Sequence, residues 1–285
     1  MKEKLKKFLD IIFPPDIICI YCGNEIKHPN KYLACDECLQ NLPYLKGKIC
    51  NLCGAKLHSL SDICFVCHSH FPPYKMARST FIYEMPLVRL VHKMKFGNAR
   101  YLFKPLAECL TKTYIEYDFN CDVIVPVPLS KERLKERGYN QAEELAKVVA
   151  KNLGLELVTN AVEKVINTER QSQLNFSQRM ENLKGAYRLK DHTPLKGKKV
   201  LVIDDVMTTG ATIRAVCDEI LKAKPAEIYV LTLAHTDITK KPIQPILYKF
   251  KKLILAKINR ELRFAKNRAR MNRKIRKILR NKNKE

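Results

Sequence analysis

The sequence lacks long apolar runs and lacks the features of an exported protein. No stretch of its 285 residues approaches the ~18 consecutive apolar residues that a membrane-spanning helix needs, so we expect no transmembrane segment. The N-terminal apolar stretch is short, Asp10 interrupts it, and no small-residue cleavage site follows, which argues against a secretory signal. We therefore expect a cytoplasmic protein, whose cysteines stay reduced and bind metal more often than they form disulfides.

The chain is also poor in acidic residues, above all at its end. It has 29 Asp and Glu against 53 Lys and Arg, a formal net charge of +24, and no tryptophan. Residues 249–285 hold 16 of the basic residues and only two glutamates. No glycine follows Gly210, no proline follows Pro245, and mainly apolar residues recur every three or four positions from Phe250 to Ile275. This pattern predicts an amphipathic basic helix of up to ~35 residues.

A basic helix of this kind has several possible partners. It can neutralise nucleic-acid phosphates with a salt-dependent affinity that ignores base sequence, lie on anionic lipid, pack against a protein, or stay a partly disordered solubilising tail. We favour nucleic acid. Phe250 and Phe264 are the only aromatic residues within 249–285, so we do not expect the tail to stack on bases.

Eight of the eleven cysteines form four CxxC pairs within the first 70 residues. The pairs are Cys19/Cys22, Cys35/Cys38, Cys50/Cys53 and Cys64/Cys67. Eight thiolates satisfy two tetrahedral Cys₄ sites, the closed coordination of structural zinc. Gaps of 12 and 10 residues between pairs favour two consecutive ribbons, while a cross-braced pairing of the first pair with the third stays open. With so few apolar residues, this module needs metal in order to fold, so zinc is expected to build a scaffold.

Two other metal groups could use the same residues. Iron–sulfur clusters also bind thiolates, although successive knuckle pairs suit zinc better. Cys64–His68 formally matches a haem-attachment motif, but attachment requires export, and Cys64 and Cys67 already complete the second zinc set. His68 or His70 could replace a thiolate, but a solvent-exposed histidine is the simpler interpretation.

Beyond Pro72-Pro73 the pattern changes to alternating helices and strands. The expected strands are 77–83, 122–128, 155–159, 200–203 and 227–233. The expected helices are 87–96, 102–117, 141–152 with Gly154 as its C-cap, and 211–224. Such alternation is typical of a doubly wound α/β domain with a parallel sheet. We expect this domain to have about 160 residues.

The most informative segment is 200–212. The apolar run Val200–Ile203 predicts a buried strand that ends at Asp204 and Asp205. A turn with two threonines and a glycine then leads into a helix. In an open α/β sheet, ligands bind beyond the carboxyl ends of the strands. Paired carboxylates can accept hydrogen bonds from sugar hydroxyls, and the N–H groups of such a turn can hold a phosphate. The segment therefore predicts a sugar-phosphate site.

Two alternatives fit this segment less well. An Asp-Asp pair after a strand also binds Mg²⁺ in receiver domains and phosphatases, but these need further acidic residues at other strand ends, and none is evident. A polar helix cap explains Thr208 or Thr209 but not the two aspartates.

Two further segments fit a sugar-phosphate site. Residues 131–141 lie between a strand and a helix, and Arg137-Gly138 stands where a turn can approach an anion closely; a solvated charged loop is the alternative. Residues 170–187 are polar at their start and have few core positions. We expect them to form a mobile lid that excludes water from the site, with an ordinary surface loop as the alternative.

The segment around Asp204-Asp205 resembles the 5-phosphoribosyl-1-pyrophosphate (PRPP) motif of type I phosphoribosyltransferases. The resemblance implies that Asp204 and Asp205 hold the ribose hydroxyls, and that Arg137 and Gly138 bind pyrophosphate. It also implies that one run of residues wraps the 5-phosphate: Met207, Thr208, Thr209, Gly210, Ala211 and Thr212.

The order of motifs over residues 15–235 resembles the ComF family, whose members are phosphoribosyltransferase-like proteins linked to natural competence, the import and handling of single-stranded DNA. The motifs are the double zinc ribbon, Lys95-Phe96-Gly97, Pro126-Val127-Pro128, Arg137–Gln141, the set Arg170, Gln173, Arg179 and Asn182, and the run from Asp204 to Gly210. Two features depart from the family. Ala234-His235 stand where members often carry an arginine, and the extension after Pro245 is longer than the family leads us to expect.

These interpretations predict four regions. They are an N-terminal amphipathic helix (1–15), a double zinc ribbon (16–73), a type I phosphoribosyltransferase-like α/β domain (74–240) and a basic helical tail (241–285).

The resemblance also implies a reaction and its partners. PRPP would be the substrate and Mg²⁺ the cofactor, with Asp204, Asp205, Arg137 and Arg170 as the catalytic set. The alternative is a non-catalytic factor that binds single-stranded DNA and uses the pocket for sensing. Single-stranded DNA, the DNA-uptake machinery and an anionic membrane surface are the implied partners, and no acceptor for the phosphoribosyl group is identified.

Overall fold

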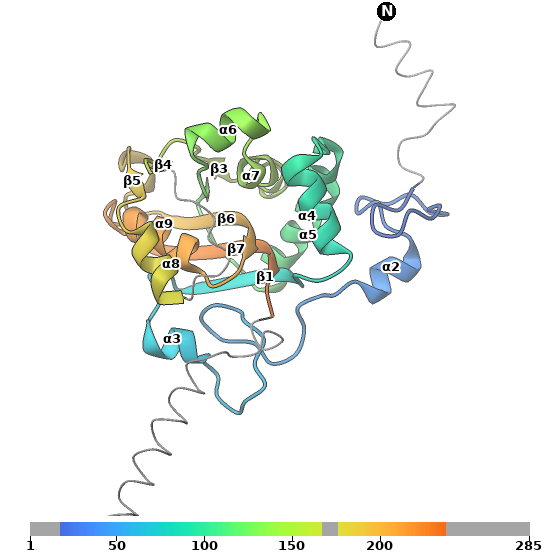
Figure 1. Cartoon of the computed structure of the whole chain (residues 1–285), viewed down its shortest axis with the longest axis horizontal. Helices are drawn as coiled ribbons and strands as arrows, with labels where there is room; N and C mark the ends of the chain where they lie inside the picture. Colours follow the sequence, from blue (N-terminus) through green and yellow to red (C-terminus); the bar gives the residue numbers. More distant parts are fainter. Residues whose placement is uncertain (1–17, 167–175, 238–285) are drawn as a thin grey trace, which may run out of the picture. The chain divides into compact units, whose positions relative to one another are not determined.

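The computed structural model describes residues 18–166 and 176–237, all within one compact unit. Its centre is a five-stranded sheet with the order β1-β7-β6-β2-β3, and every neighbouring pair is parallel (Figure 1). The strands are β1 (Met76–Ile82), β2 (Val123–Pro126), β3 (Glu156–Leu157), β6 (Lys199–Met207) and β7 (Glu227–His235). The predicted parallel α/β sheet is confirmed, and β6 continues through the two aspartates instead of ending at them.

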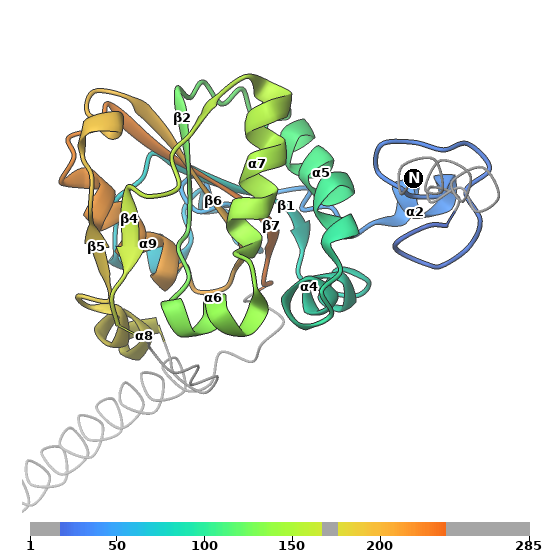
Figure 2. The ribbon, with the colours of Figure 1, turned by 90° about the horizontal axis from the view of Figure 1, so that it is seen from above.

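Side chains of the central strands alternate between two hydrophobic cores, one on each face of the sheet. Along β6, Leu201 and Ile203 enter the first core, whereas Val200 and Val202 enter the second. The covering helices are α4 (Leu87–Phe96), α5 (Phe103–Glu116), α7 (Gln141–Leu153) and α9 (Ala211–Leu221). Helices α4, α5 and α7 fill the first core and α9 the second (Figure 2). β2 and residues 200–203 of β6 are continuous apolar runs because both faces of the parallel sheet are covered.

Residues between β2 and β6 contain structure that the sequence did not indicate. The segment expected as an anion-binding loop begins with helix α6 (Lys131–Arg137), and the side chain of Ser130 caps this helix by accepting the N–H of Arg133 at 3.4 Å. Strands β4 (Val162–Lys164) and β5 (Tyr187–Leu189) form a separate antiparallel pair. Helix α8 (Phe176–Leu183) occupies much of the expected lid. The start of that lid, including Arg170 and Gln173, lies outside the described residues.

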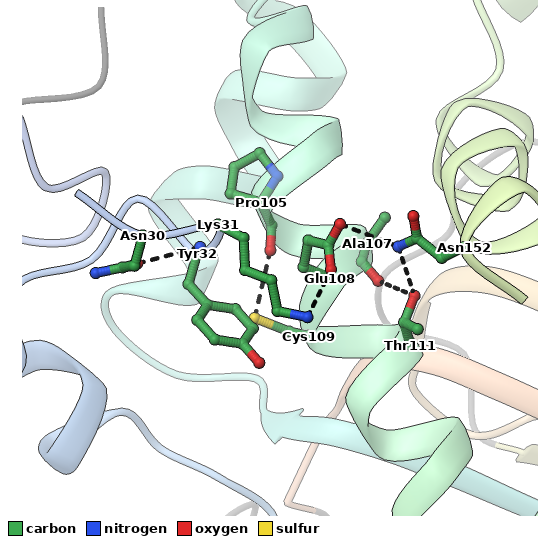
Figure 3. Close-up of polar contacts among 9 residues, drawn as sticks. All are labelled: Asn30, Lys31, Tyr32, Pro105, Ala107, Glu108, Cys109, Thr111 and Asn152. Atoms are coloured by element: carbon green, nitrogen blue, oxygen red, sulfur yellow. Dashed lines mark hydrogen bonds and ion pairs between the residues drawn. The ribbon is translucent and has the colours of Figure 1, made fainter.

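The zinc ribbons attach to this domain by specific contacts. The first ribbon, which contains the short helix α2 (Asp36–Asn41), places Lys31 Nζ 3.1 Å from Glu108 Oε2 on α5. Asn152 of α7 donates a hydrogen bond to the other oxygen of that carboxylate at 3.0 Å, so ribbon, α5 and α7 are linked in series (Figure 3).

The segment that connects the two ribbons runs along the outer edge of the main sheet. The N–H of Ile82 donates to Pro43 O at 2.7 Å, and that of Leu45 donates to Thr80 O at 3.0 Å. Tyr44 and Phe81 pair as an antiparallel bridge. The connecting segment therefore covers the edge of β1, which would otherwise present unpaired backbone groups. The second ribbon follows and contains α3 (Phe65–Ser69).

No helix within residues 18–166 and 176–237 is both long enough and apolar enough to cross a bilayer. The helices predicted for 1–15 and 241–285 fall outside the described residues.

Candidate functional site

A cavity of about 490 Å³ lies where β2 and β6 end, and the residues that follow both strands line it. This is the position at which open α/β sheets bind ligands. Seven of the residues predicted for the sugar-phosphate site border it: Arg137, Asp204, Asp205, Thr208, Thr209, Ala211 and Thr212. The described residues of its wall do not include Gly138, Met207 or Gly210. These three residues shape the backbone next to the residues that line the cavity. Arg170 cannot be placed, because it lies outside the described residues.

The turn between β6 and α9 has the local form that an anion site needs. Gly210 precedes α9 with a φ of +77°, and a Cβ added there would stand 2.8 Å from Met207 Cε. Any other residue at this position would therefore have a strained backbone, and the terminal methyl group of Met207 would have to shift. Helix α9 begins at Ala211, and its first N–H groups have no partner within the helix. Ala211 and Thr212 border the cavity, where the positive end of the helix dipole favours a negative charge.

Asp205 forms an ion pair with a lysine that was not among the residues predicted for the site. Lys95 Nζ on α4 lies 2.8 Å from Asp205 Oδ2, and the two side chains are only 13% and 10% exposed. The backbone N–H of Asp205 donates to Asp204 Oδ1 at 2.8 Å, which orients the neighbouring carboxylate. The signal that could have indicated Lys95 was its place in the Lys95-Phe96-Gly97 motif.

A second wall of the cavity comes from the corner between α6 and α7. Gly138 ends α6 with a left-handed φ of +75°, and the side chain of Asn140 ties the corner to the end of β2 by donating to Val127 O at 2.9 Å. Arg137 Nη1 donates to Gln141 Oε1 at 2.9 Å. Gln141 Nε2 is buried and makes no hydrogen bond to any described residue. Because buried donors normally have partners, a ligand oxygen is a suitable one.

The wall contributed by β5 and α6 adds a tyrosine and a second arginine. Tyr187 and Arg133 both line the cavity. Burial raises the pKa of Tyr187, and the negative charge of Asp204 raises it further, while Arg133 and a hydrogen bond with Thr212 act in the opposite direction. Tyr187 is therefore a neutral hydroxyl, close enough to Asp204 and Thr212 to influence both.

A further wall belongs to α4 and combines apolar and aromatic side chains. Phe96 is 53% exposed, its ring centroid lies 4.8 Å from that of His92, and the guanidinium carbon of Arg137 lies 5.2 Å from it. Val88 and Val91 complete this side. An exposed ring beside a cation at the edge of a polar cavity offers a surface on which a planar group can stack.

The eight cysteines of the four CxxC pairs form two separate tetrads. Within each tetrad all ligand sulfurs lie within 4.8 Å of one another, and the members are Cys19, Cys22, Cys35 and Cys38, then Cys50, Cys53, Cys64 and Cys67. The ribbons are therefore consecutive and not cross-braced. Tetrahedral zinc with Zn–S bonds of ~2.3 Å separates its sulfurs by ~3.8 Å. The distances of 3.7 Å between Cys22 and Cys35 and of 3.6 Å between Cys53 and Cys64 fit that geometry.

A parallel sheet that presents an acidic pair and a small hydroxyl-bearing turn at its carboxyl edge defines the class as a phosphoribosyltransferase-type domain, here joined to zinc ribbons. The family model described as phosphoribosyl transferase domain matches residues 102–262, and that described as double zinc ribbon domain matches residues 8–71.

Relatives of known name share most of the chain. It is 30% identical to "Competence protein F" of Haemophilus influenzae over 228 residues, which cover 76% of this chain and 96% of the relative. It is 31% identical to "DNA utilization protein YhgH" of Salmonella typhi over 193 residues (66% and 84%). It is 28% identical to "Competence protein ComFC" of Bacillus subtilis over 240 residues (77% and 95%). The chain therefore belongs to the ComF family, in which a double zinc ribbon precedes a phosphoribosyltransferase domain.

Proposed function

We propose that the cavity binds PRPP together with Mg²⁺ and that the protein acts as a phosphoribosyltransferase-like factor of natural competence. The observation that supports this most directly is that one 490 Å³ cavity collects the acidic pair, the start of α9 and two arginines. Each group suits one part of PRPP. Carboxylates accept hydrogen bonds from the ribose hydroxyls, the turn receives the 5-phosphate, and Arg137 and Arg133 compensate the charge of the pyrophosphate.

The donor set also fits Mg²⁺, since sites that bind this ion with a phosphorylated substrate use one or two carboxylates plus phosphate oxygens. Asp204 and Asp205 are the two acidic residues of the described wall. When bound, the ion would neutralise part of the charge on the departing pyrophosphate.

The chain's own residues would then act by positioning and electrostatics. As the bond to the anomeric carbon breaks, positive charge develops on the ribose, and the carboxylates of Asp204 and Asp205 stabilise it while holding the ring. The guanidinium of Arg137 stabilises the negative charge that grows on the leaving group. The buried hydroxyl of Tyr187 and the apolar side chains of α4 reduce the access of water.

A second candidate function, binding of single-stranded DNA without turnover, is favoured by the mouth of the cavity. Phe96 is half exposed and lies beside Arg137 and His92, and exposed rings interleaved with cations are typical of surfaces that bind single strands. The relatives' names refer to competence and DNA utilization, which supports DNA as a partner. The basic tail would add phosphate contacts or hold the protein near an anionic membrane and the DNA-uptake machinery. Thiolate zinc sites suit the reducing cytoplasm.

Pyrophosphate release distinguishes the two functions. The protein is incubated with PRPP, Mg²⁺ and candidate acceptors, with Asp205→Asn as the test variant and Asp191→Asn, which lies outside the cavity wall, as the matched control. Release that the Asp205 variant abolishes and the Asp191 variant keeps supports transfer. Tight binding without release supports the non-catalytic function, and absence of both binding and release contradicts the proposal.

A further inference from the structure

The turn that borders the substrate cavity also borders a smaller hollow. Thr208 and Thr209 line the 490 Å³ cavity and also a hollow of about 130 Å³. Three ligands of the second cysteine tetrad, Cys53, Cys64 and Cys67, line the same hollow. The turn is therefore a thin partition between the proposed phosphate site and the second metal site.

Arg214 links the tetrad to the helix that begins at this partition. Its side chain is buried, with 4% exposure, and its Nη2 donates to Cys67 Sγ at 3.6 Å. Arg214 stands one helical turn after Gly210, whose carbonyl oxygen accepts its backbone N–H at 2.9 Å. Hydrogen bonds to metal ligands orient these ligands and tune the metal site. In this protein the same bond also fixes the first turn of α9.

Charge balance distinguishes the second tetrad from the first. Four thiolates around Zn²⁺ carry a net charge of −2, which is costly in a site where all four cysteines are buried unless other groups compensate it. Two buried arginines supply +2. One is Arg214, and the other is Arg78, which is 8% exposed and whose Nη1 donates to the carbonyl oxygen of Cys50 at 3.5 Å. The first tetrad is open to solvent at Cys22, so water can screen its charge.

The second tetrad is also held on the side away from α9. The N–H of Ala77 on β1 donates to Leu52 O at 2.7 Å. Gly54, in the metal knuckle, approaches the same strand so closely that a Cβ on it would stand 2.8 Å from Ala77 O. The tetrad therefore connects the sheet edge rigidly to the start of α9.

We propose that the metal of the second tetrad sets the conformation of the phosphate turn through Arg214, so that loading of this tetrad, and not of the first, controls anion binding in the cavity. Without metal, nothing fixes the position of Cys67 Sγ, which accepts the hydrogen bond of Arg214. The first turn of α9, which carries Arg214, would then lose this attachment and move. Arg214 is a positioning residue, since it touches a metal ligand and not the sugar phosphate. The binding part of the proposal rests on the proposed PRPP function.

The test uses the full chain and keeps all eight cysteines. Arg214→Gln removes the charge, Arg214→Lys restores it, and Arg89→Gln is the matched control, because Arg89 donates to the backbone oxygen of Tyr21 in the first ribbon. Three quantities are measured for each protein. They are the rate of zinc release to a chelator, hydrogen–deuterium exchange of residues 207–214, and affinity for PRPP with Mg²⁺ by calorimetry.

In Arg214→Gln we expect one of the two zinc ions to be released roughly 10- to 100-fold faster, the range seen when partners of metal ligands are removed. We also expect faster exchange across residues 207–214 and weaker PRPP binding. Arg214→Lys should recover part of each effect, and Arg89→Gln should behave as the unmodified protein. Unchanged zinc release and exchange in Arg214→Gln would overturn the proposal. If the unmodified protein does not bind PRPP, the proposed function fails, and the zinc and exchange measurements still decide this inference.

Discussion

The ion pair of Lys95 and Asp205 yields a quantitative prediction about the site. Its atoms are 2.8 Å apart and its side chains are 13% and 10% exposed. Replacing Lys95 by methionine keeps most of the apolar stem of the side chain, removes the ammonium group and leaves the Asp205 carboxylate without this partner. Removal of one member of a fully buried pair costs ~3–5 kcal/mol. Because the cavity admits water, we expect the free energy of unfolding to fall by about 1–3 kcal/mol, between the values for buried and exposed pairs.

A double-mutant cycle measured by urea unfolding isolates this interaction. The four proteins are the unmodified chain, Lys95→Met, Asp205→Asn and the double variant, and we expect a coupling energy of about 1–2 kcal/mol. Lys147→Met is the matched control, because Lys147 lies at nearly the same distance, 2.9 Å, from Glu143 but is 48% exposed. It should cost about 0.5 kcal/mol or less. Effects of the two cavity substitutions that add to within about 0.5 kcal/mol would refute the assignment.

Three further predictions concern the turn, the arginine and the tail. Gly210→Ala should lower the free energy of unfolding by about 1–2 kcal/mol and weaken PRPP binding, because its Cβ would meet Met207 Cε; Gly185→Ala, with a φ of +70° and open space around it, measures the backbone part alone. Arg137→Gln should weaken binding of PRPP but not of ribose 5-phosphate in calorimetry, since we propose that Arg137 contacts only the pyrophosphate; equal losses for both would be inconsistent with this role. Deleting residues 249–285 should flatten the salt dependence of single-strand DNA binding, and an unchanged slope would reject a DNA role for the tail.

The sheet was predictable because its local signals are strong. The apolar run before Asp204 can be buried on both faces only in a covered parallel strand, and Gly154 ends α7 with the left-handed φ of +67° expected of a C-cap. Helix α6 was missed because Leu134 is its only apolar residue, so no hydrophobic period marks it. Its evidence lies instead in the capping residues Ser130 and Gly138.

The site was predictable where its residues are contiguous and not where folding assembles them. Asp204, Asp205 and the turn stand together in the sequence, so their joint chemistry could be inferred. Lys95 comes from α4 and Tyr187 from β5, elements distant in sequence from Asp204, and each reaches the cavity only in the folded chain. The contact of Arg214 with Cys67 was equally inaccessible, because no local pattern relates a helix to a distant metal knuckle.

The most direct measurement is a calorimetric titration of the zinc-loaded protein with PRPP in the presence of Mg²⁺. We expect one binding site per chain, with the affinity reduced at least about tenfold, or about 1.4 kcal/mol, in Asp204→Asn and Asp205→Asn and unchanged in Asp191→Asn. Heat of binding that is absent in the unmodified protein, or equal in all four proteins, would contradict a phosphorylated pentose as the ligand of this cavity.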